Sequence, residues 1–457
     1  MQLTFCGAAR AVTGSNYLIQ LKNGQSILLD CGLYQGNDAD MQTFNNNFPY
    51  YDPSKIEFLI ISHAHIDHIG RIPKLVKEGF NGQIFCTHAT RSLAALLLMD
   101  AAKIQEKEAS DAFPPLYTAK DVRAALALFT GLSYERWHFV DTEIELFFRD
   151  TGHILGSASV TLEIKENEQT ILLGFSGDIG RPERPILKDP IPMPAVDYLI
   201  CESTYGHKEH QNYTADINDL LYIVKETCLL NEGKLLIPAF SVGRTQELIY
   251  MLDQLETAGK LPKIPVYVDS PLAINAVDVF KMHPECYDEQ LHDYLLVDPN
   301  PFGFSDLNYV KRGGLANRLA QSKEPCIIIS SSGMMTSGRV KRHLFHLLGD
   351  SNNTVLAVGY CAPNTLGGQL LSGQKKVHLY GQNITVRARI QRLVSFSAHA
   401  DRREMLQFLS LQQELKKIFL VHGEYYAQHQ FQQFLEQNDF RDVEIPTLGS
   451  SYTLGTD

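Results

Sequence analysis

The sequence predicts an α/β protein built from two kinds of region. Residues 1–62 and 158–176 hold short β-type runs separated by turn residues, whereas from about residue 197 continuous apolar runs alternate with helical patterns. The first pattern is typical of hairpins and mixed sheets, and the second of a parallel sheet covered by helices on both faces. With 457 residues, the chain is long enough for two or three domains with a sizeable core.

The first half of the chain contains the hairpin signals. Strands are expected at Tyr17–Leu21 and Ser26–Cys31, because Asn23-Gly24 between two apolar runs is a strong turn signal. Further elements are expected as a strand at 58–61, helices at 91–109 and 120–131, and a second hairpin from runs 158–164 and 170–176.

The second half alternates strands with helices. The apolar runs expected to form strands cover residues 197–201, 235–237, 266–268, 327–329 and 355–358. Helical patterns fall between them, for example at 215–230 and 245–255. A last strand at 418–421 precedes His422, and a helix and a short strand are expected after it.

Composition excludes several classes of protein. The chain carries 41 Lys and Arg against 52 Asp and Glu, a net charge of −11, which argues against a surface coated in basic residues. Its eight cysteines are at least 25 positions apart, so no C-x-x-C pair exists, and they are expected to be buried thiols. No signal peptide or membrane span is visible, so we expect a soluble, cytoplasmic protein with no membrane partner.

The strongest local signal is a histidine cluster after the strand expected at 58–61. Three imidazoles and one carboxylate fall within six positions of the segment Ser62-His63-Ala64-His65-Ile66-Asp67-His68. Imidazole and carboxylate are ligands for zinc, iron or manganese, and a cation compensates the cost of desolvating so many polar groups. A chance run of surface histidines is the ordinary alternative, and the dense spacing disfavours it.

The cluster resembles the signature of the metallo-β-lactamase superfamily. Gly152-His153, Ser176-Gly177-Asp178 and Asp30 match further positions of that family. Glu202 in 201–206, His399 in 395–401 and His422 in 420–424 resemble the three motifs of its β-CASP branch, which contains RNA- and DNA-processing nucleases. Other segments that match this branch are Ile237–Arg244, Asp269–Leu272, Ser331–Met335 and Gly359–Gly367.

The resemblance implies a fold and a division of the chain. The fold class is α/β, with a metallo-β-lactamase αββα sandwich into which an α/β β-CASP domain with a parallel sheet is inserted. Residues 1–205 and 395–457 would form the two parts of the first domain, and residues 206–394 the inserted one. The active site is expected in the cleft between these two domains.

The resemblance also implies a metal centre with two Zn²⁺ per chain, for which Mn²⁺ is the alternative ion. His63, His65 and His153 would hold one ion, and Asp67, His68 and His422 the other. Asp178 would bridge the ions, while Asp30 would orient the histidine loop without binding metal.

The implied activity is that of a metal-dependent ribonuclease. Two adjacent ions would activate a hydroxide for attack on the phosphodiester, leaving a 5′-phosphate and a 3′-hydroxyl. His399 would be the general acid for the leaving 3′-oxygen, with Glu202 holding its tautomer and its proton. Catalysis is thus assigned to His399, Glu202, Asp30 and Asp67.

The inserted region is expected to hold the RNA, which we expect to be single-stranded. Between Asp306 and Phe345 the seven basic residues and two acids give a local charge of +5, which is either a phosphate track or a solvated helix face. The basic residues are Lys311, Arg312, Arg318, Lys323, Arg339, Lys341 and Arg342. Arg244, Ser332 and Arg339 are the candidate substrate contacts.

Several alternatives stay open from sequence. The same site could act on DNA or another phosphodiester, or the chain could be a catalytically silent RNA-binding subunit. A β-lactam or thioester hydrolase is disfavoured because the late motifs at His399 and His422 would have no role in it. Endonuclease and 5′→3′ exonuclease modes are both compatible with the motifs, as are a monomer and a homodimer.

Overall fold

The computed structural model describes residues 1–35, 39–110, 113–166, 169–210, 216–311, 313–359, 361–393 and 398–455. Its contacts divide the chain into unit 1, Met1–Glu209 with Ala398–Asp457, and unit 2, His210–Ser397. Arg312, Tyr360, the segment 395–397 and the expected domain limit at 394/395 lie outside the described residues.

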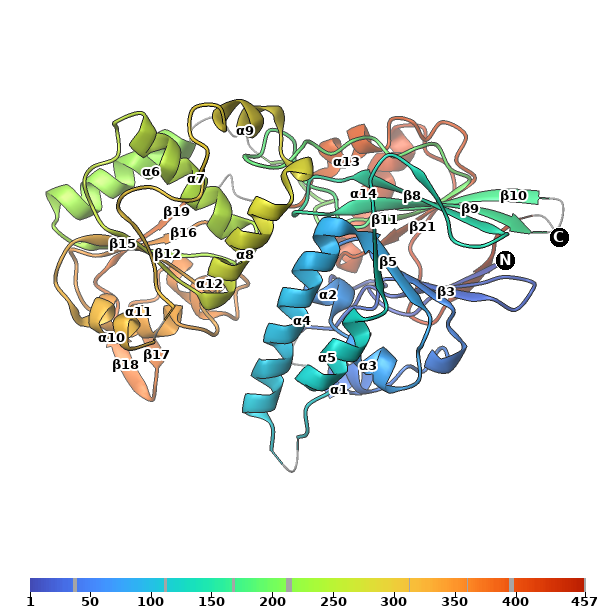
Figure 1. The fold of residues 1–457 in the computed structure, drawn as a ribbon, viewed down its shortest axis with the longest axis horizontal. Helices are drawn as coiled ribbons and strands as arrows, with labels where there is room; N and C mark the ends of the chain where they lie inside the picture. The colour runs from blue at the N-terminus through green and yellow to red at the C-terminus, as the bar shows by residue number, and fades with distance from the viewer. Residues whose placement is uncertain are drawn as a thin grey trace. The chain divides into compact units, whose positions relative to one another are not determined.

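Unit 1 contains two seven-stranded sheets (Figure 1). The first runs, in order across the sheet, β22(Ser451–Thr453), β1(Gln2–Phe5), β2(Tyr17–Gln20), β3(Ser26–Leu29), β4(Phe58–Ile60), β5(Gln83–Thr87) and β6(Phe129–Leu132). The second runs β21(Val443–Glu444), β20(Lys417–Val421), β11(Tyr198–Glu202), β10(Gln169–Phe175), β9(Ala158–Glu166), β8(Ile144–Asp150) and β7(Trp137–Phe139).

Helices cover the outer faces of this sandwich. On the first sheet, α4 packs on β5 and β6 and also contacts α5. The helices near this sheet are α1(Ala39–Asn46), η1(Pro53–Lys55), α2(Ile66–Ile69), α3(Ile72–Lys77), α4(His88–Glu108) and α5(Ala119–Leu126). The second sheet is covered by α13(Arg402–Phe408) and α14(Tyr425–Gln437), drawn in red in Figure 1. The order helix, sheet, sheet, helix confirms the predicted αββα architecture.

The core explains why the central strands are apolar along their whole length. Phe419 and Val421 of β20 point into the cluster between the two sheets, which also contains Phe5 and Phe175. Ile418 and Leu420 of the same strand join a second cluster with the α13 and α14 side chains. A strand buried on both faces needs apolar residues at consecutive positions rather than at alternate ones.

The hairpin predicted at Asn23-Gly24 is confirmed, with β2 and β3 antiparallel and Gly24 at φ +97°. The hairpin of β9 and β10 is also confirmed. The helix predicted at 120–131 is wrong at its end, because α5 stops at Leu126 and Phe129–Leu132 pairs with β5 as β6. A short apolar run at the end of a helix has no periodicity that separates strand from helix, so only the pairing decides.

Unit 2 is built on a six-stranded sheet in which every pairing is parallel, as predicted. Its order is β14(Leu307–Tyr309), β13(Val266–Asp269), β15(Cys326–Ser330), β12(Lys234–Pro238), β16(Thr354–Ala357) and β19(Arg389–Arg392). A small hairpin comprises β17(Lys376–Leu379) and β18(Gln382–Thr385). The helices are α6(Asp216–Val224), η2(Lys225–Leu230), α7(Arg244–Thr257), α8(Pro271–Met282), η3(Pro284–Cys286), α9(Glu289–Tyr294), α10(Gly313–Gln321), α11(Val340–Leu347) and α12(Leu366–Leu371).

Candidate metal centre

Polar side chains gather at one edge of the second sheet of unit 1. Strands β10, β11 and β20 are neighbours and run parallel, so their carboxyl ends meet at the same edge. Glu202 ends β11, His422 directly follows β20, and Asp178 lies three residues beyond β10. The parallel pairing therefore brings together residues that are up to 244 positions apart in the sequence.

The histidine loop joins the cluster from the first sheet. It leaves β4 and enters the short helix α2, with His65 at the N-cap and Asp67 and His68 inside the helix. The carboxylate of Asp30 accepts hydrogen bonds from the Ser62 backbone N–H (2.9 Å) and the Ser62 hydroxyl, which anchors the start of this loop. The loop is thereby held by a residue at the end of the neighbouring strand.

One group of ligand atoms comprises His63, His65, His153 and Asp178. His65 Nδ1 lies 3.1 Å from Nε2 of both His63 and His153. Oδ2 of Asp178 lies 3.4 Å from the same two Nε2 atoms. Four ligand atoms of the types that bind zinc therefore converge on one point.

A second group comprises Asp67, His68 and His422. The Nε2 atoms of His68 and His422 are 3.3 Å apart, and Oδ2 of Asp67 lies 3.4 Å from His422 Nε2. The other carboxylate oxygen of Asp178, Oδ1, faces this group at 3.4 Å from His68 Nε2 and 3.5 Å from His422 Nδ1. The two oxygens of Asp178 thus face the two groups separately.

The outer nitrogens of four histidines have hydrogen-bond partners, which assigns their tautomers. His68 Nδ1 lies 2.6 Å from Asp30 Oδ2, and His153 Nδ1 lies 3.2 Å from the carbonyl of Ala398. His63 Nδ1 bonds the Ser62 hydroxyl, and His422 Nδ1 bonds the Thr204 hydroxyl, both at 3.1 Å. A proton on each outer nitrogen leaves the inner Nε2 as a lone pair that faces the cluster.

Three of these supporting groups were not predicted from the sequence. Ser62 and Thr204 are hydroxyl neighbours of motif residues, and a hydroxyl in a motif is too common to single out. The carbonyl of Ala398 carries no side-chain signal at all. Asp30, which the sequence did indicate, adopts φ +57°, and His422 adopts φ +50°, so both have an uncommon backbone conformation next to the cluster.

The electrostatics favour neutral imidazoles in the first group and ionised carboxylates, but not a neutral His68. Burial would lower the pKa of His68, but the carboxylates of Asp178 and Asp30 outweigh it and raise that pKa well above the ordinary range. Burial lowers the pKa of His63 and His153 well below the ordinary range, and it lowers the pKa of His65 to about 4. Burial alone would raise the pKa of Asp67, but its hydrogen bond to His422 and the nearby imidazoles lower it to about 2. Neutral imidazole and ionised carboxylate are the protonation states that bind a metal ion.

His399 lies beside the cluster but outside both groups. Its Nδ1 is 3.2 Å from Oε1 of Glu202 and 3.9 Å from Oδ2 of Asp178. Burial lowers its pKa, but the carboxylate of Glu202, together with those of Asp178 and Asp67, outweighs burial and raises the pKa of His399 to about 9. Glu202 is fully buried, and its carboxylate also accepts backbone N–H bonds from Ile179 and Thr204, so its position is firmly held.

The three candidate substrate contacts lie in unit 2. Arg244 is buried and pairs with Glu247. Arg339 donates to Asp269 at 2.6 Å and to the carbonyls of Val310 and Lys311. Both guanidinium groups therefore have internal partners.

The third candidate, Ser332, follows β15, and Arg244 follows the neighbouring parallel strand β12, so both lie at one edge of that sheet. The Ser332 hydroxyl donates to the carbonyl of Ser337 at 3.3 Å. Of the basic residues between Asp306 and Phe345, Lys311, Arg318 and Lys323 are exposed.

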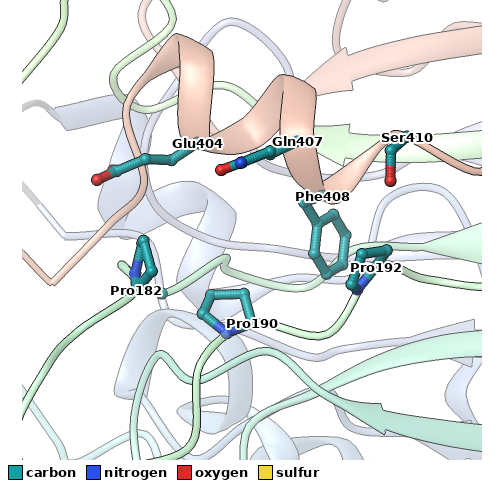
Figure 2. Close-up of a pocket in the computed structure, with 8 residues that line it drawn as sticks. Pro182, Pro190, Pro192, Glu404, Gln407, Phe408 and Ser410 are labelled. Atoms are coloured by element: carbon teal, nitrogen blue, oxygen red, sulfur yellow. The ribbon is translucent and has the colours of Figure 1, made fainter.

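A separate small pocket of about 220 Å³ lies against α13 (Figure 2). Its walls are formed by prolines and Phe408, with the polar side chains of Glu404 and Gln407 above them. None of the predicted metal ligands lines it. Glu404 accepts a hydrogen bond from Arg181 (3.1 Å), so the polar side of the pocket is part of an ion pair.

Within the described residues, no helix is long and apolar enough to cross a membrane.

Three family models match the chain in succession. The metallo-beta-lactamase superfamily matches residues 9–220, the Beta-Casp domain residues 245–370, and the Zn-dependent metallo-hydrolase RNA specificity domain residues 383–446.

Curated relatives cover nearly the whole chain. It is 34% identical over 426 residues to "Ribonuclease TTHA0252" of Thermus thermophilus, covering 93% of each chain. It is 30% identical to an "RNase J-like protein" of Methanocaldococcus jannaschii over 98% of this chain and 97% of the relative. It is 32% identical to "Transcription termination factor FttA" of the same organism, over 93% of this chain and 67% of the relative.

A solved structure of a protein of unknown function from Enterococcus faecalis has a TM-score of 0.57 at 12% identity and covers 99% of both chains, which supports the fold. The matches to family models and the curated relatives agree with the His and Asp cluster of unit 1. This chain therefore belongs to the β-CASP branch of the metallo-β-lactamase superfamily of metallo-hydrolases.

Proposed function

We propose that this protein is a metal-dependent ribonuclease that hydrolyses RNA phosphodiester bonds. The observation that carries the proposal is the convergence of five imidazoles and two carboxylates into two adjacent ligand groups in unit 1. The names of the relatives, a ribonuclease and an RNase J-like protein, support RNA as the substrate. The match to an RNA specificity domain supports the same substrate class.

The residues of the cluster fit a metal centre on physical grounds. His65 Nδ1 lies 3.1 Å from Nε2 of both His63 and His153, so the ring nitrogens of the three histidines face one another. Oδ1 of Asp178 is buried and has no hydrogen-bond partner among the described residues. Imidazole nitrogens that face one another and a buried carboxylate oxygen that accepts no hydrogen bond are costly unless a cation compensates them.

We assign two Zn²⁺ per chain, with Mn²⁺ as the alternative ion. His63, His65 and His153 would hold one ion, Asp67, His68 and His422 the other, and Asp178 both. Such ions would supply an activated water for attack on phosphorus and would offset the charge of the phosphate. Asp30 would act through His68 by holding its tautomer.

The proton for the leaving oxygen comes from His399 in this proposal. The Glu202 carboxylate, 3.2 Å from Nδ1, and the nearby Asp178 and Asp67 carboxylates raise the pKa of His399 to about 9, so the imidazole is protonated at neutral pH. With Nδ1 held by Glu202, the proton on Nε2 is the one available to a substrate. A positioned acid of this kind contributes typically about 10²–10⁴-fold to the rate.

The RNA is expected to enter as a single strand, since an accessible phosphodiester must reach a cluster in which most ligands are buried. Ser332 is the proposed polar contact in unit 2. Arg244 and Arg339 are further proposed contacts, which would use the edges of guanidinium groups already held by Glu247 and Asp269.

One experiment tests the activity and its mode together. Purified protein is incubated with end-labelled single-stranded RNAs that carry 5′-triphosphate, 5′-monophosphate or 5′-hydroxyl, in zinc or manganese, beside a DNA of the same sequence. We expect RNA fragments with 5′-phosphate and 3′-hydroxyl ends, and the product sizes separate internal cleavage from trimming. Cleavage of DNA alone would replace RNA by DNA as the substrate. An absence of cleavage with intact RNA binding would favour a silent RNA-binding subunit.

A further inference from the structure

Unit 1 carries a group of rings close to the metal cluster, which we call the aromatic strip: the half-buried Tyr205 and the exposed His207, Tyr425, Tyr426 and His429. Tyr425 and Tyr426 are 52% and 65% exposed, an unusual state for two consecutive large side chains. They open α14, whose buried face is supplied instead by Ala427, Gln428, Phe431 and Leu435. Packing of the helix therefore does not account for the two tyrosines.

The strip is continuous with the residues proposed to act on the substrate. The ring of Tyr205 lies 5.9 Å from that of His399, nearly perpendicular to it. From Tyr205 the next ring is His207 at 6.4 Å, and from His207 the next is Tyr426 at 5.9 Å. A series of neighbouring rings thus leads from the proposed general acid to the exposed tyrosines.

Cationic groups accompany these rings. Lys208 Nζ lies 3.7 Å from the centroid of the Tyr205 ring, and the Arg10 guanidinium lies 4.8 Å from that of Tyr425. His429 stacks parallel to Tyr425, with 6.2 Å between centroids and 8° between planes. Aromatic faces combined with Lys and Arg are the features that bind single-stranded nucleic acid without sequence preference.

Two acidic groups described near the strip have cationic or polar neighbours of their own. Glu209 pairs with Arg402 and with Arg403, the latter at 3.0 Å. Glu424, at the N-cap of α14, is exposed and interacts electrostatically with His207. Because two arginines offset the charge of Glu209, the side chains of Lys208 and Arg10 can still attract a phosphodiester backbone.

We propose that the aromatic strip is a base-stacking surface on which nucleotides flanking the cleaved phosphate bind. The inference rests on the proposed ribonuclease function, and it adds a site within unit 1 that positions single-stranded RNA by its bases. Tyr425 and Tyr426 supply the exposed rings, while Lys208 and Arg10 attract the backbone. Because every base has a π-face, the surface would tolerate any sequence.

The test compares the full-length wild-type protein with the double variant Tyr425→Ala/Tyr426→Ala in steady-state cleavage of a fluorophore- and quencher-labelled single-stranded RNA. We expect KM to rise at least about tenfold in the double variant, with kcat changed less than about threefold. The conservative variant Tyr425→Phe/Tyr426→Phe keeps the rings and should behave as wild type. Tyr222→Ala, which removes a tyrosine that is 66% exposed on α6, is the matched control for loss of a surface ring.

A second substrate separates stacking from backbone contact. Replacing the nucleotides that flank the cleaved bond by abasic ones should raise KM for the wild type and leave the double variant with little further change. An unchanged KM in the double variant, or an equal abasic penalty in both proteins, overturns the proposal.

The failure of this inference is distinguishable from failure of the proposed function. If wild-type protein cleaves no nucleic acid, the ribonuclease proposal fails, and the strip is then tested by fluorescence anisotropy of labelled oligouridylate with the full chain. The proposal that the aromatic strip binds bases is supported if the alanine variant binds the oligonucleotide at least about tenfold more weakly than wild type and the phenylalanine variant binds it equally well. Equal binding by all three proteins overturns it.

Discussion

Nδ1 of His399 lies 3.2 Å from Oε1 of Glu202, although 197 positions separate the two residues. Glu202 ends strand β11, and His399 lies in the segment that returns to unit 1 after unit 2. The main-chain bond from Ala400 N–H to the Ile179 carbonyl (2.8 Å) holds this segment beside Asp178. The proposed acid is thus positioned by the same sheet edge that carries the proposed ligands.

The first prediction concerns His399. His399→Ala should retain the wild-type metal content, because His399 belongs to neither ligand group, while RNA cleavage falls about 10²–10⁴-fold. Metal analysis and single-turnover cleavage measure the two effects. His378→Ala, on β17 of unit 2, is the matched control and should keep full activity. Unchanged cleavage by His399→Ala would mean that another group is the general acid.

A second prediction concerns the charge of Glu202. In Glu202→Gln the carboxylate that raises the pKa of His399 is absent, so the protonated imidazole should be lost at lower pH than in wild type. The alkaline limb of the pH–rate profile should therefore move to lower pH. The cleavage rate of the variant should fall below that of the wild type by less at about pH 6 than at about pH 8. Profiles that coincide would show that Glu202 does not control the proton of His399.

Asp178 should affect both ligand groups, because its two oxygens face different groups. Asp178→Asn is expected to lower the metal content below one ion per chain. His65→Ala should weaken the binding of one ion more than that of the other. Elemental analysis after dialysis measures both. Asp442→Asn, which alters a surface carboxylate paired with Lys417, is the control and should retain the wild-type content.

Asp30 should act on metal affinity through His68. Its Oδ2 lies 2.6 Å from His68 Nδ1, and loss of such an outer partner typically weakens metal binding about 10–100-fold. Asp30→Asn should therefore show this weakening in competition with a fluorescent zinc chelator. Wild-type affinity in this variant would remove Asp30 from the proposed centre.

A prediction about stability concerns Asp253 in unit 2. This carboxyl is fully buried, accepts a hydrogen bond from Tyr294 (2.6 Å), and has one oxygen without a partner among the described residues. Burial raises its pKa to about 6, so the folded state binds the proton more tightly than the unfolded state. The free energy of unfolding should then fall as pH rises from about 4 to 6 and stay lower above that range.

Asp253→Asn removes this ionisation while it keeps an acceptor for Tyr294. The variant should be more stable than wild type at about pH 8, by about 1 kcal/mol, and should show no such gain at about pH 4. Urea unfolding at the two pH values measures the difference. If the variant gained the same free energy of unfolding at both pH values, the effect would come from packing and not from the ionisation of Asp253.

Local patterns were sufficient for much of the fold. Asn23-Gly24 predicted its hairpin because a two-residue turn is specified by its own residues, and the apolar runs predicted the parallel strands because burial on both faces requires them. The end of α5 was predicted wrongly, because the strand state of Phe129–Leu132 depends on its pairing with β5.

The candidate site, like the fold, was predicted in part from local sequence signals, and the rest depended on long-range contacts. The spacing from His63 to His68 is a local signal, and those few residues are enough to indicate a metal-binding pattern. Which nitrogen of each imidazole faces the cluster depends on distant partners such as Asp30 and Thr204, and only the folded chain brings them within hydrogen-bonding distance.

The sequence predicted Arg244 and Arg339 as substrate contacts, and both stay proposals. What the sequence did not predict is that the fold supplies them with Glu247 and Asp269 as internal partners. Residue types and short spacings thus established the chemistry available to this protein. The parallel pairing of β10, β11 and β20 decided where that chemistry assembles, because long-range pairing depends on the whole buried core rather than on any local run.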